Sequence, residues 1–273
     1  MNNPSSFFEQ RPDEPARLEV INISVAYGDR PALKNLSFDV PHGEQIAIVG
    51  PNGAGKSTLF KALVGLLPLQ EGKILIHGKP LGHHLDCVAY VPQREEVDWR
   101  FPVTVRDVVL MGRYGRLGWL QKPDKSDNEA VQRALEQMGI SDLACRAIGD
   151  LSGGQQQRVF LARSIAQQPH IMLLDEPFTG VDAITQQATL ELLDQLRKAD
   201  VTVLVSTHDL DLAARRFDRV LLINHSLIAY GSAEQVFSHE NLHQAFSGQI
   251  LHIGGAVVVD QCCPPDDIHL REV

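Results

Sequence analysis

An α/β fold is predicted, with a parallel sheet, an N-terminal antiparallel β region and an inserted helical segment. Three observations predict it. Gln45–Val49, Ile171–Leu174 and Val201–Val205 are short apolar runs of the kind found in parallel strands buried on both faces. The helix expected over Ala183–Leu196 separates the last two runs, and this alternation indicates right-handed βαβ crossovers. Residues 92–150 show helical patterns and no strong strand.

Antiparallel pairing is expected near both ends of this core. Leu36, Phe38 and Val40 alternate with polar residues, as in a half-buried strand, and the apolar-rich segment Leu18–Val25 precedes them. Together they indicate an antiparallel hairpin region. Residues 219–230 resemble a second, closing hairpin that turns at Asn224 and His225. Further helices are expected over residues 58–67, 126–138 and 152–167.

Composition limits the classes of function. The chain has 273 residues, 44% of them hydrophobic, which is enough for one large domain. Its net charge of −9 argues against a nucleic-acid partner. The first residues lack the basic start and apolar stretch of a signal peptide, and no apolar run approaches the ~18–20 residues of a membrane span. We therefore expect a soluble cytosolic chain that reaches a membrane only through a partner.

A glycine-rich segment after the first buried run predicts a phosphate-binding loop. It matches GxxxxGK[ST] and lies between an expected strand and an expected helix. Its glycines let backbone N–H groups wrap a phosphate, Lys56 would bridge the β- and γ-phosphates, and Ser57 would bind Mg²⁺. The expected nucleotide-binding residues of this loop are Gly50, Pro51, Asn52, Gly53, Ala54, Gly55, Lys56, Ser57 and Thr58.

Two carboxylates end the apolar run Ile171–Leu174. Because ligands bind at the carboxyl ends of parallel strands, Asp175 is expected to hold Mg²⁺, directly or through water. Glu176 follows it and is expected to act as the general base that activates the attacking water.

A second anion site is predicted about a hundred residues after the loop. Ser152 can cap a helix whose first residues, Gly153 and Gly154, expose backbone N–H groups at its positive end. Since the chain already has a complete phosphate loop, this second site suggests that two subunits enclose each ATP, head to tail. The motif that would act on the partner's nucleotide consists of Leu151, Ser152, Gly153, Gly154 and Gln155.

With these motifs in this order, the chain resembles an ATP-binding cassette (ABC) ATPase, since Leu151–Gln155 is identical to that family's signature sequence. The resemblance implies a P-loop NTPase core that binds ATP and Mg²⁺. It also implies roles for four further residues. Gln93 matches the Q-loop glutamine, which lies near the metal and the γ-phosphate, and His208 matches the switch histidine. Asp182 matches the D-loop aspartate that contacts the other subunit of the dimer, and Tyr27 matches the aromatic residue that stacks on adenine. The D-loop wording, Phe178-Thr-Gly-Val-Asp182, departs from the family's commonest Ser-Ala-Leu-Asp.

The first residues are interpreted as a disordered leader over 1–16. The resemblance implies an ABC ATPase domain over 17–248 with the helical insert at about 92–150, and it leaves a C-terminal tail over 249–273. The chain has one cassette, and the spacing of its motifs leaves no room for a coiled-coil arm. Transport is therefore favoured over a soluble ABC ATPase that remodels a protein or nucleic-acid complex. Without fused spans, the chain resembles the ATPase subunit of a bacterial importer, peripheral on the inner face of the plasma membrane.

The stretch from Val91 to Tyr114 is similar to the branch that imports manganese, zinc or iron, with manganese favoured and another substrate left open. Expected partners are a second copy of the chain, a polytopic membrane permease and, indirectly, a solute-binding protein. Trp99, Phe101 and Met111 could contact the permease or belong to the core.

Other metal-binding residue types form no recognisable set. Cys262 and Cys263 are adjacent and are interpreted as part of a solvent-facing tail, because the four cysteines show no CxxC spacing. The remaining candidates do not have the spacing of metal ligands: His83, His84, His239, His243, His252 and His269.

Overall fold

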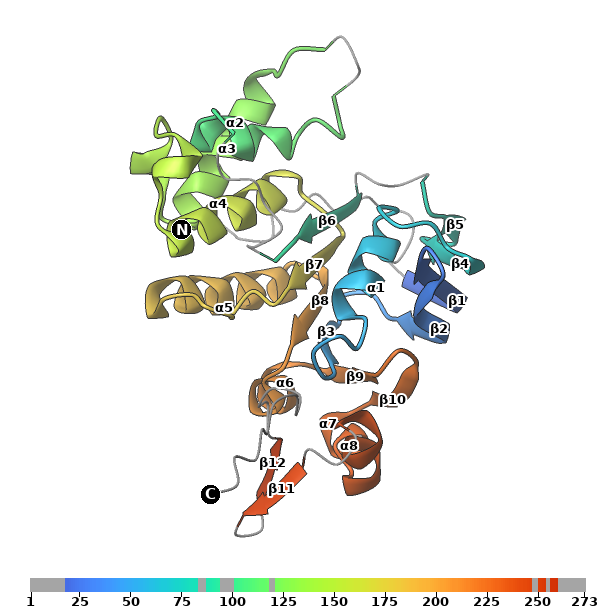
Figure 1. The fold of residues 1–273 in the computed structure, drawn as a ribbon. Coiled ribbons are helices and arrows are strands. Elements are labelled where there is room, and N and C mark those ends of the chain that lie inside the picture. The colour runs from blue at the N-terminus through green and yellow to red at the C-terminus, as the bar shows by residue number, and fades with distance from the viewer. Residues whose placement is uncertain are drawn as a thin grey trace, which may run out of the picture.

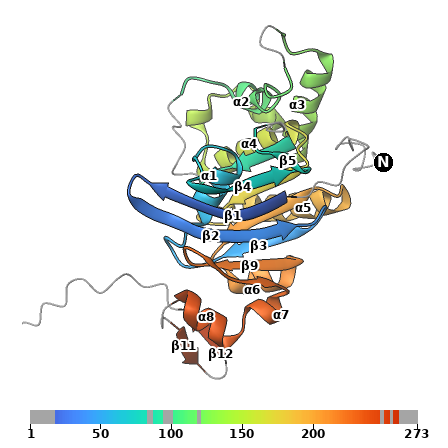
Figure 2. The same ribbon diagram turned by 90° about the vertical axis from the view of Figure 1, so that its right-hand side faces the viewer.

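A six-stranded sheet forms the centre of the molecule (Figures 1 and 2). The structure is a computed structural model that describes residues 18–82, 87–93, 101–117, 121–246, 250–253 and 256–259. The strand order is β10-β9-β3-β8-β7-β6. Its strands are β3 (Gln45–Val49), β6 (Val88–Val91), β7 (Ile171–Asp175), β8 (Thr202–Thr207), β9 (Arg219–Ile223) and β10 (Leu227–Gly231). All neighbours pair in parallel except β9 and β10, so the parallel sheet and its closing hairpin are confirmed.

A second, antiparallel sheet lies on one side of this core, in the order β2-β1-β4-β5 (Figure 2). It contains β1 (Leu18–Tyr27), β2 (Arg30–Val40), β4 (Glu71–Ile76) and β5 (Lys79–Pro80). The hairpin expected from the alternation at Leu36 to Val40 is therefore present. The sequence did not reveal β4, because its first three residues are exposed and include Glu71, Gly72 and Lys73.

Helices connect the strands and cover the core (Figure 1). They are α1 (Lys56–Leu63), α2 (Val105–Met111), α3 (Lys125–Gln137), α4 (Gly153–Ala166), α5 (Ala183–Lys198), α6 (Leu210–Arg216), α7 (Ala233–Val236) and α8 (His239–Phe246), with 3-10 turns η4 (Ser141–Leu143) and η5 (Ile148–Asp150). The expected helices over 126–138, 152–167 and 183–196 are confirmed within two residues. The one expected over 58–67 starts two residues earlier and ends at Leu63.

Side chains of the parallel strands alternate between two apolar cores. Ala47 and Val49 of β3 face the core that contains α4 and α5, whereas Ile46 and Ile48 face the other. That second core contains α1, with Leu59 and Phe60 packed between the two sheets. Burial on both faces explains why these strands are continuous apolar runs.

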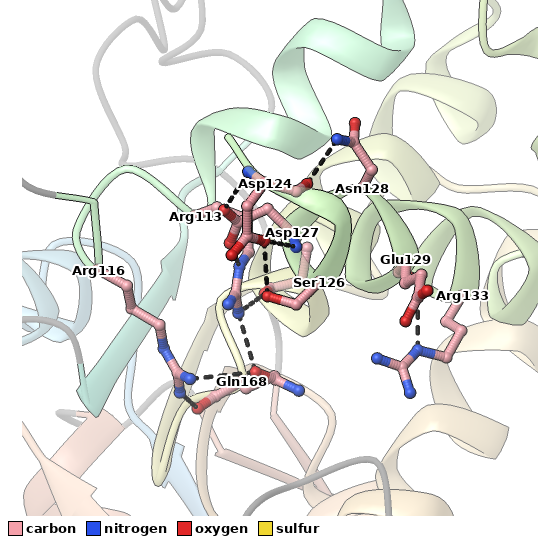
Figure 3. A network of polar contacts seen from close by, with 10 residues as sticks. Arg113, Arg116, Asp124, Ser126, Asp127, Asn128, Glu129, Arg133 and Gln168 are labelled. Carbon is pink, nitrogen blue, oxygen red and sulfur yellow. Dashed lines mark hydrogen bonds and ion pairs between the residues drawn. The ribbon is translucent and has the colours of Figure 1, made fainter. Parts of the chain in front are cut away.

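The helical insert is attached to the core through a buried polar network (Figure 3). The Arg113 guanidinium, just after α2, donates to the Asp127 carboxylate in α3 at 2.8 Å and to the Ala166 carbonyl at the end of α4 at 2.9 Å. Arg113 and Arg116 both donate to Gln168, in the segment that leads into β7. Two helices of the insert and the start of a core strand therefore share one set of hydrogen bonds.

The ends of the chain are described in part. The leader expected over 1–16 lies outside the described residues, as do Cys262, Cys263 and most of the tail. Within the tail, β11 (Ile250–Ile253) and β12 (Ala256–Val259) pair antiparallel, although no strand was predicted there. Among the described residues, no helix is both long enough and apolar enough to cross a bilayer.

Candidate nucleotide site

Most of the residues expected to bind nucleotide follow the carboxyl ends of parallel strands in the core sheet. The phosphate loop follows β3, Gln93 comes two residues after β6, and Glu176 directly follows β7. They line one cavity of about 670 Å³. Its described lining consists of Tyr27, Arg30, Pro31, Ala32, Asn52, Gly53, Ala54, Gly55, Lys56, Ser57, Thr58, Gln93, Glu176 and His225. Segments distant in sequence thus meet where a parallel sheet binds its ligands.

The loop requires glycine for conformation at one position and for space at another. Gly55 has φ +97° and precedes α1, a left-handed conformation that residues with a Cβ rarely adopt. At Gly50, an added Cβ would overlap the carbonyl oxygen of Ile223 in β9. The glycines at both ends of the motif are therefore required by the fold as well as by a phosphate.

Lys56 points into its own loop. Its ammonium donates to the carbonyls of Gly50 at 2.9 Å and Pro51 at 3.1 Å, and lies 3.9 Å from a Glu176 carboxylate oxygen. Burial lowers the pKa of Lys56, and the negative charges of Glu176 and Asp175 partly oppose this effect. The loop thus holds a buried cation beside two acidic residues, where a phosphate oxygen could replace the carbonyl acceptors.

The two acidic residues after β7 occupy different environments. Asp175 is 1% exposed, and its carboxylate accepts hydrogen bonds from the Ser206 hydroxyl at 2.5 Å and the Tyr90 hydroxyl at 3.4 Å. Glu176 lies at the cavity wall with φ +47°, its backbone N–H donating to Ser206 at 2.8 Å and its carboxylate accepting from Thr179 at 3.2 Å. The buried Asp175 carboxylate, held by two hydroxyl groups, is therefore followed in sequence by the Glu176 carboxylate at the cavity wall.

Sequence reasoning missed Ser206, which holds both of these acidic residues. Ser206 pairs with Asp175 because β7 and β8 are parallel neighbours, and no motif in the sequence records that strand order. Arg30, Ala32 and His225 of the cavity wall were also missed. His225 belongs to the β9–β10 turn and contacts the Ala32 carbonyl at 3.0 Å through Nδ1, a proximity that no motif records.

The donors expected for Mg²⁺ fit that ion chemically. Ser57, Gln93 and Asp175 offer a hydroxyl, an amide and a carboxylate oxygen, and Mg²⁺ prefers oxygen ligands. Ser57 and Gln93 line the cavity, and Asp175 directly precedes Glu176 of its wall. Ser57 and Gln93 therefore face the cavity, whereas Asp175 is buried next to its wall.

Tyr27 lies at the outer end of the cavity. It is 49% exposed, and its hydroxyl lies 3.4 Å from the hydroxyl of Thr58 in α1. An exposed aromatic ring next to the loop could stack on a base. His208, in contrast, follows β8 with an exposed side chain and is absent from the described lining of the cavity.

The signature motif starts α4 away from this cavity. Ser152 is exposed, and its hydroxyl accepts from the Gln155 N–H while the Gln155 side chain accepts from the Ser152 N–H at 2.9 Å. This capping box confirms the expected cap. The described lining of the cavity includes none of Leu151 to Gln155, so the motif and the phosphate loop of one chain do not share a pocket.

Asp182 packs against the start of α4. It caps α5 by accepting from the Thr185 N–H at 2.7 Å, and this hydrogen bond is the main reason that its pKa is lowered. A Cβ at Gly154 would overlap the Asp182 carboxylate and the Thr185 hydroxyl. Gly154 is therefore required by packing against the D-loop as well as by the exposed amides predicted from sequence.

Comparisons with known proteins agree with this geometry. The family model described as ABC transporter matches residues 33–179. The manganese transport system ATP-binding protein MntB of Bacillus subtilis is 48% identical over 89% of this chain and 97% of its own length. The zinc transport system ATP-binding protein TroB of Treponema pallidum is 48% identical over 85% of this chain and 88% of its own. The chelated iron transport system membrane protein YfeB of Yersinia pestis is 47% identical over 86% and 81%.

Solved structures share the fold. The ADP conformation of MJ1267, an ATP-binding cassette of an ABC transporter, superposes with a TM-score of 0.71 at 26% identity, over 85% of this chain and 99% of that one. The protein cbiO1 from Clostridium perfringens, part of the transporter complex cbiONQ, gives 0.69 at 28% identity, over 85% and 94%. In sequence, architecture and the arrangement of its nucleotide cavity, this chain belongs to the ABC transporter family, as an ATP-binding and ATP-hydrolysing member.

Proposed function

We propose that the chain energises the uptake of a divalent transition metal by a bacterial importer, with manganese as the preferred substrate and zinc or iron as the alternatives. One observation carries this proposal. A cavity lined by the phosphate loop, Gln93 and Glu176 occurs in a chain that is 48% identical to a manganese transport ATP-binding protein over 89% of its length. Manganese appears in the names of several relatives, and zinc and iron in others.

The hydrolytic chemistry is assigned to residues of the cavity wall. Tyr27 stacks on adenine, residues 50–58 hold the phosphates, and Lys56 moves from its loop carbonyls to the β- and γ-phosphates. Glu176 accepts a proton from the attacking water, and its contact with Thr179 supports a fixed orientation. Gln93 and His208 approach the γ-phosphate from the ends of β6 and β8. Positioning and charge stabilisation account for most of the rate enhancement.

Magnesium would be held by Ser57, Gln93 and Asp175, directly or through water, and would neutralise charge on the β- and γ-phosphates. The Ser206 hydroxyl supports this role by keeping the Asp175 carboxylate in one orientation at 2.5 Å. A hydrogen bond to a carboxylate that binds a metal commonly fixes its orientation toward the ion.

A second copy of the chain completes the site. Residues 151–155 of one subunit close over the γ-phosphate in the other, and Asp182 lies at the contact between them. The exposed N-terminus of α4, separate from the cavity of its own chain, supports this arrangement. Closure and reopening of the pair would move the attached membrane subunits.

The membrane partner is a polytopic permease, which places the chain on the cytoplasmic face of the membrane, and a solute-binding protein supplies the metal from outside. Phe101 is 62% exposed and Tyr114 is 55% exposed on either side of α2, and these apolar surfaces support contact with the permease. Met111 is half-buried at the end of α2, and Trp99 lies outside the described residues.

Metal uptake tests the proposal directly. A strain that lacks the gene is supplied with labelled Mn²⁺, Zn²⁺ or Fe²⁺, and uptake is compared after complementation with the wild type or with Glu176→Gln. We expect loss of Mn²⁺ uptake on deletion, restoration by the wild type, and no restoration by the variant. Unchanged uptake of all three metals would refute the metal substrate. Co-purification with ribosomes or DNA in place of a membrane protein would refute transport altogether.

A mixture of two variants tests the paired site. Ser152→Arg and Lys56→Ala each disable one half of both composite sites, so each protein should be inactive by itself. When they are mixed, a mixed pair contains one site with an intact loop and an intact signature motif. We expect the mixture to recover part of the ATPase activity. A mixture as inactive as its components would refute action across subunits.

A further inference from the structure

Three metal-ligating side chains meet at the opposite edge of the core sheet from the nucleotide. They are His77 in the β4–β5 turn, Cys87 directly before β6, and His170 directly before β7. Their candidate ligand atoms all lie within 4.8 Å of one another, and His170 Nδ1 is 3.1 Å from His77 Nε2. Among the described residues, this is the one group of three His, Cys, Asp or Glu side chains with that arrangement.

The parallel pairing of β6 and β7 brings Cys87 and His170 together. Val88 pairs with Ile171, so the residues before them are neighbours, and the His170 N–H donates to the Cys87 carbonyl at 2.8 Å. His77 reaches them from the antiparallel sheet, in a turn where its φ is +52°. Both sheets therefore contribute to the group. Because Cys87 and His170 precede their strands whereas Gln93 and Glu176 follow them, the group lies away from the ATP cavity.

Burial is graded across the group in a way that suits a bound ion. Cys87 is 3% exposed, whereas His77 and His170 are half-buried. A thiolate is stabilised in a buried position when a cation binds it. The partly exposed imidazoles give the group access to solvent, from which water could supply a fourth ligand.

The ligand types and spacing select the metal. Tetrahedral Zn²⁺ has Zn–N near 2.0–2.1 Å and Zn–S near 2.3 Å, which places its ligand atoms about 3.4–3.6 Å apart. The two imidazole nitrogens are 3.1 Å apart, so they need to separate by only a few tenths of an ångström. Thiolate with imidazole favours Zn²⁺ strongly over Mn²⁺ or Mg²⁺, which prefer oxygen ligands. We propose that His77, Cys87 and His170 form a Zn²⁺ site that is separate from the nucleotide-linked magnesium.

The alternative is a hydrogen-bonded pair of histidines beside a buried thiol. The two rings pack edge to face with centroids 5.1 Å apart, as such a pair can. The two interpretations predict different effects of added metal on the stability of the folded state. A Zn²⁺ ion would join the β4–β5 turn to the starts of β6 and β7, so it would stabilise the folded state by mass action. At a Zn²⁺ concentration a hundred times Kd, the melting temperature should rise by about 5 °C or more.

The binding experiment uses the full chain with Cys145, Cys262 and Cys263 replaced by serine, so that Cys87 is the remaining thiol of the four. Zn²⁺ is titrated against a chromophoric chelator, and Co²⁺ serves as a spectroscopic probe. We expect one equivalent of Zn²⁺ and a thiolate-to-cobalt charge-transfer band. Cys87→Ser should abolish the band, and His77→Gln and His170→Gln should each weaken Zn²⁺ binding at least about tenfold. His243→Gln, in α8, is the matched histidine control and should bind normally.

Thermal unfolding provides the second measurement. Zn²⁺ should raise the melting temperature of the thiol-reduced background but not that of its Cys87→Ser derivative. ATP binding by each variant in the absence of Zn²⁺ checks folding. If Cys87→Ser fails to fold, His77→Gln in the exposed hairpin decides the question. Equal Zn²⁺ affinity in the background and in all three ligand variants would overturn the proposal, as would the absence of any Zn²⁺ binding. Neither result depends on whether the chain serves a metal importer.

Discussion

The phosphate loop and the signature motif both place glycines at the N-terminus of a helix, but their surroundings differ. At the loop, Lys56, Gln93 and Glu176 converge on a cavity of about 670 Å³. At the signature motif, Ser152 caps α4 and Gly154 packs against Asp182, outside that cavity. The same local geometry therefore lies in a cavity lined by several strand ends in one place, and outside that cavity in the other.

This difference indicates that the amides at a helix N-terminus are only one part of a binding site. Residues from neighbouring elements are needed to form the rest of it. Strand order in the sheet brings Gln93 and Glu176 to the loop that contains Lys56. The signature motif instead follows the helical insert and starts α4, outside the described lining of that cavity. The predictions below disturb one of the two regions at a time.

The largest effect is expected at the loop. Glu176→Gln removes the proposed base while its amide keeps a similar shape, so ATP turnover should fall by about 10²–10⁴-fold. ATP binding should persist, and a closed pair of subunits should accumulate. Steady-state phosphate release, nucleotide binding and gel filtration measure the three properties. Glu191→Gln, an exposed position on α5, is the matched control and should keep normal turnover. Normal turnover by Glu176→Gln itself would exclude the assigned role.

The next effect concerns the attachment of the helical insert, which directly precedes the signature motif in the sequence. Arg113→Met leaves the Asp127 carboxylate buried without its cation, at a pair whose side chains are 8% and 6% exposed. The cost should be about 3–5 kcal/mol of unfolding free energy. Chemical denaturation measures it. Arg106→Met is the control, because Arg106 is exposed and should cost little. Equal losses for both variants would show that the buried network is not what holds the insert.

A smaller loss is expected where the signature motif meets the D-loop. Gly154→Ala introduces a methyl group that overlaps Asp182 and Thr185, so the start of α4 or of α5 must shift. Overpacking of this kind costs about 1–3 kcal/mol. Gly153→Ala, one residue earlier in α4, is the comparison in the same denaturation experiment. If Gly153→Ala proves the more costly of the two, close packing does not explain the requirement for Gly154.

The smallest effect tests the cap of the signature helix. Ser152→Ala removes the acceptor for the Gln155 N–H, and the loss should be about 1 kcal/mol. Ser232→Ala on α7 breaks an equivalent capping box and should destabilise by a similar amount. ATP turnover separates the two variants, since the Ser152 variant alone should also lose activity if the motif contacts a partner's nucleotide. Equal turnover in the two would indicate that Ser152 serves only as a cap.

Much of the fold could be predicted because its signals are local. The apolar runs of β3, β7 and β8 and the capping residues of α3, α4 and α5 specify their elements within a few residues. Strand β4, whose first three residues are exposed, and the short helix α7 escaped prediction because their apolar patterns are brief. The start of α1 was misplaced, since Lys56 and Ser57 have helical backbone conformations while also belonging to the phosphate motif.

The site was predictable where motifs exist and unpredictable where only strand order creates contacts. Gly50–Thr58 and Glu176 follow from residue types at fixed spacing. Ser206 beside Asp175, and His77 beside His170, depend on which strands are neighbours. No spacing in one sequence encodes that information, so these contacts needed the three-dimensional structure.

Asp182 contacts the starts of two helices, and this has a mechanical consequence. It caps α5 and lies against Gly154, so α4 cannot shift toward it without displacing the loop that contains Thr179. The Thr179 hydroxyl in turn donates to Glu176. A displacement of the N-terminus of α4, caused by a neighbouring molecule, would therefore reach the Glu176 carboxylate at the wall of the chain's own cavity through one short loop.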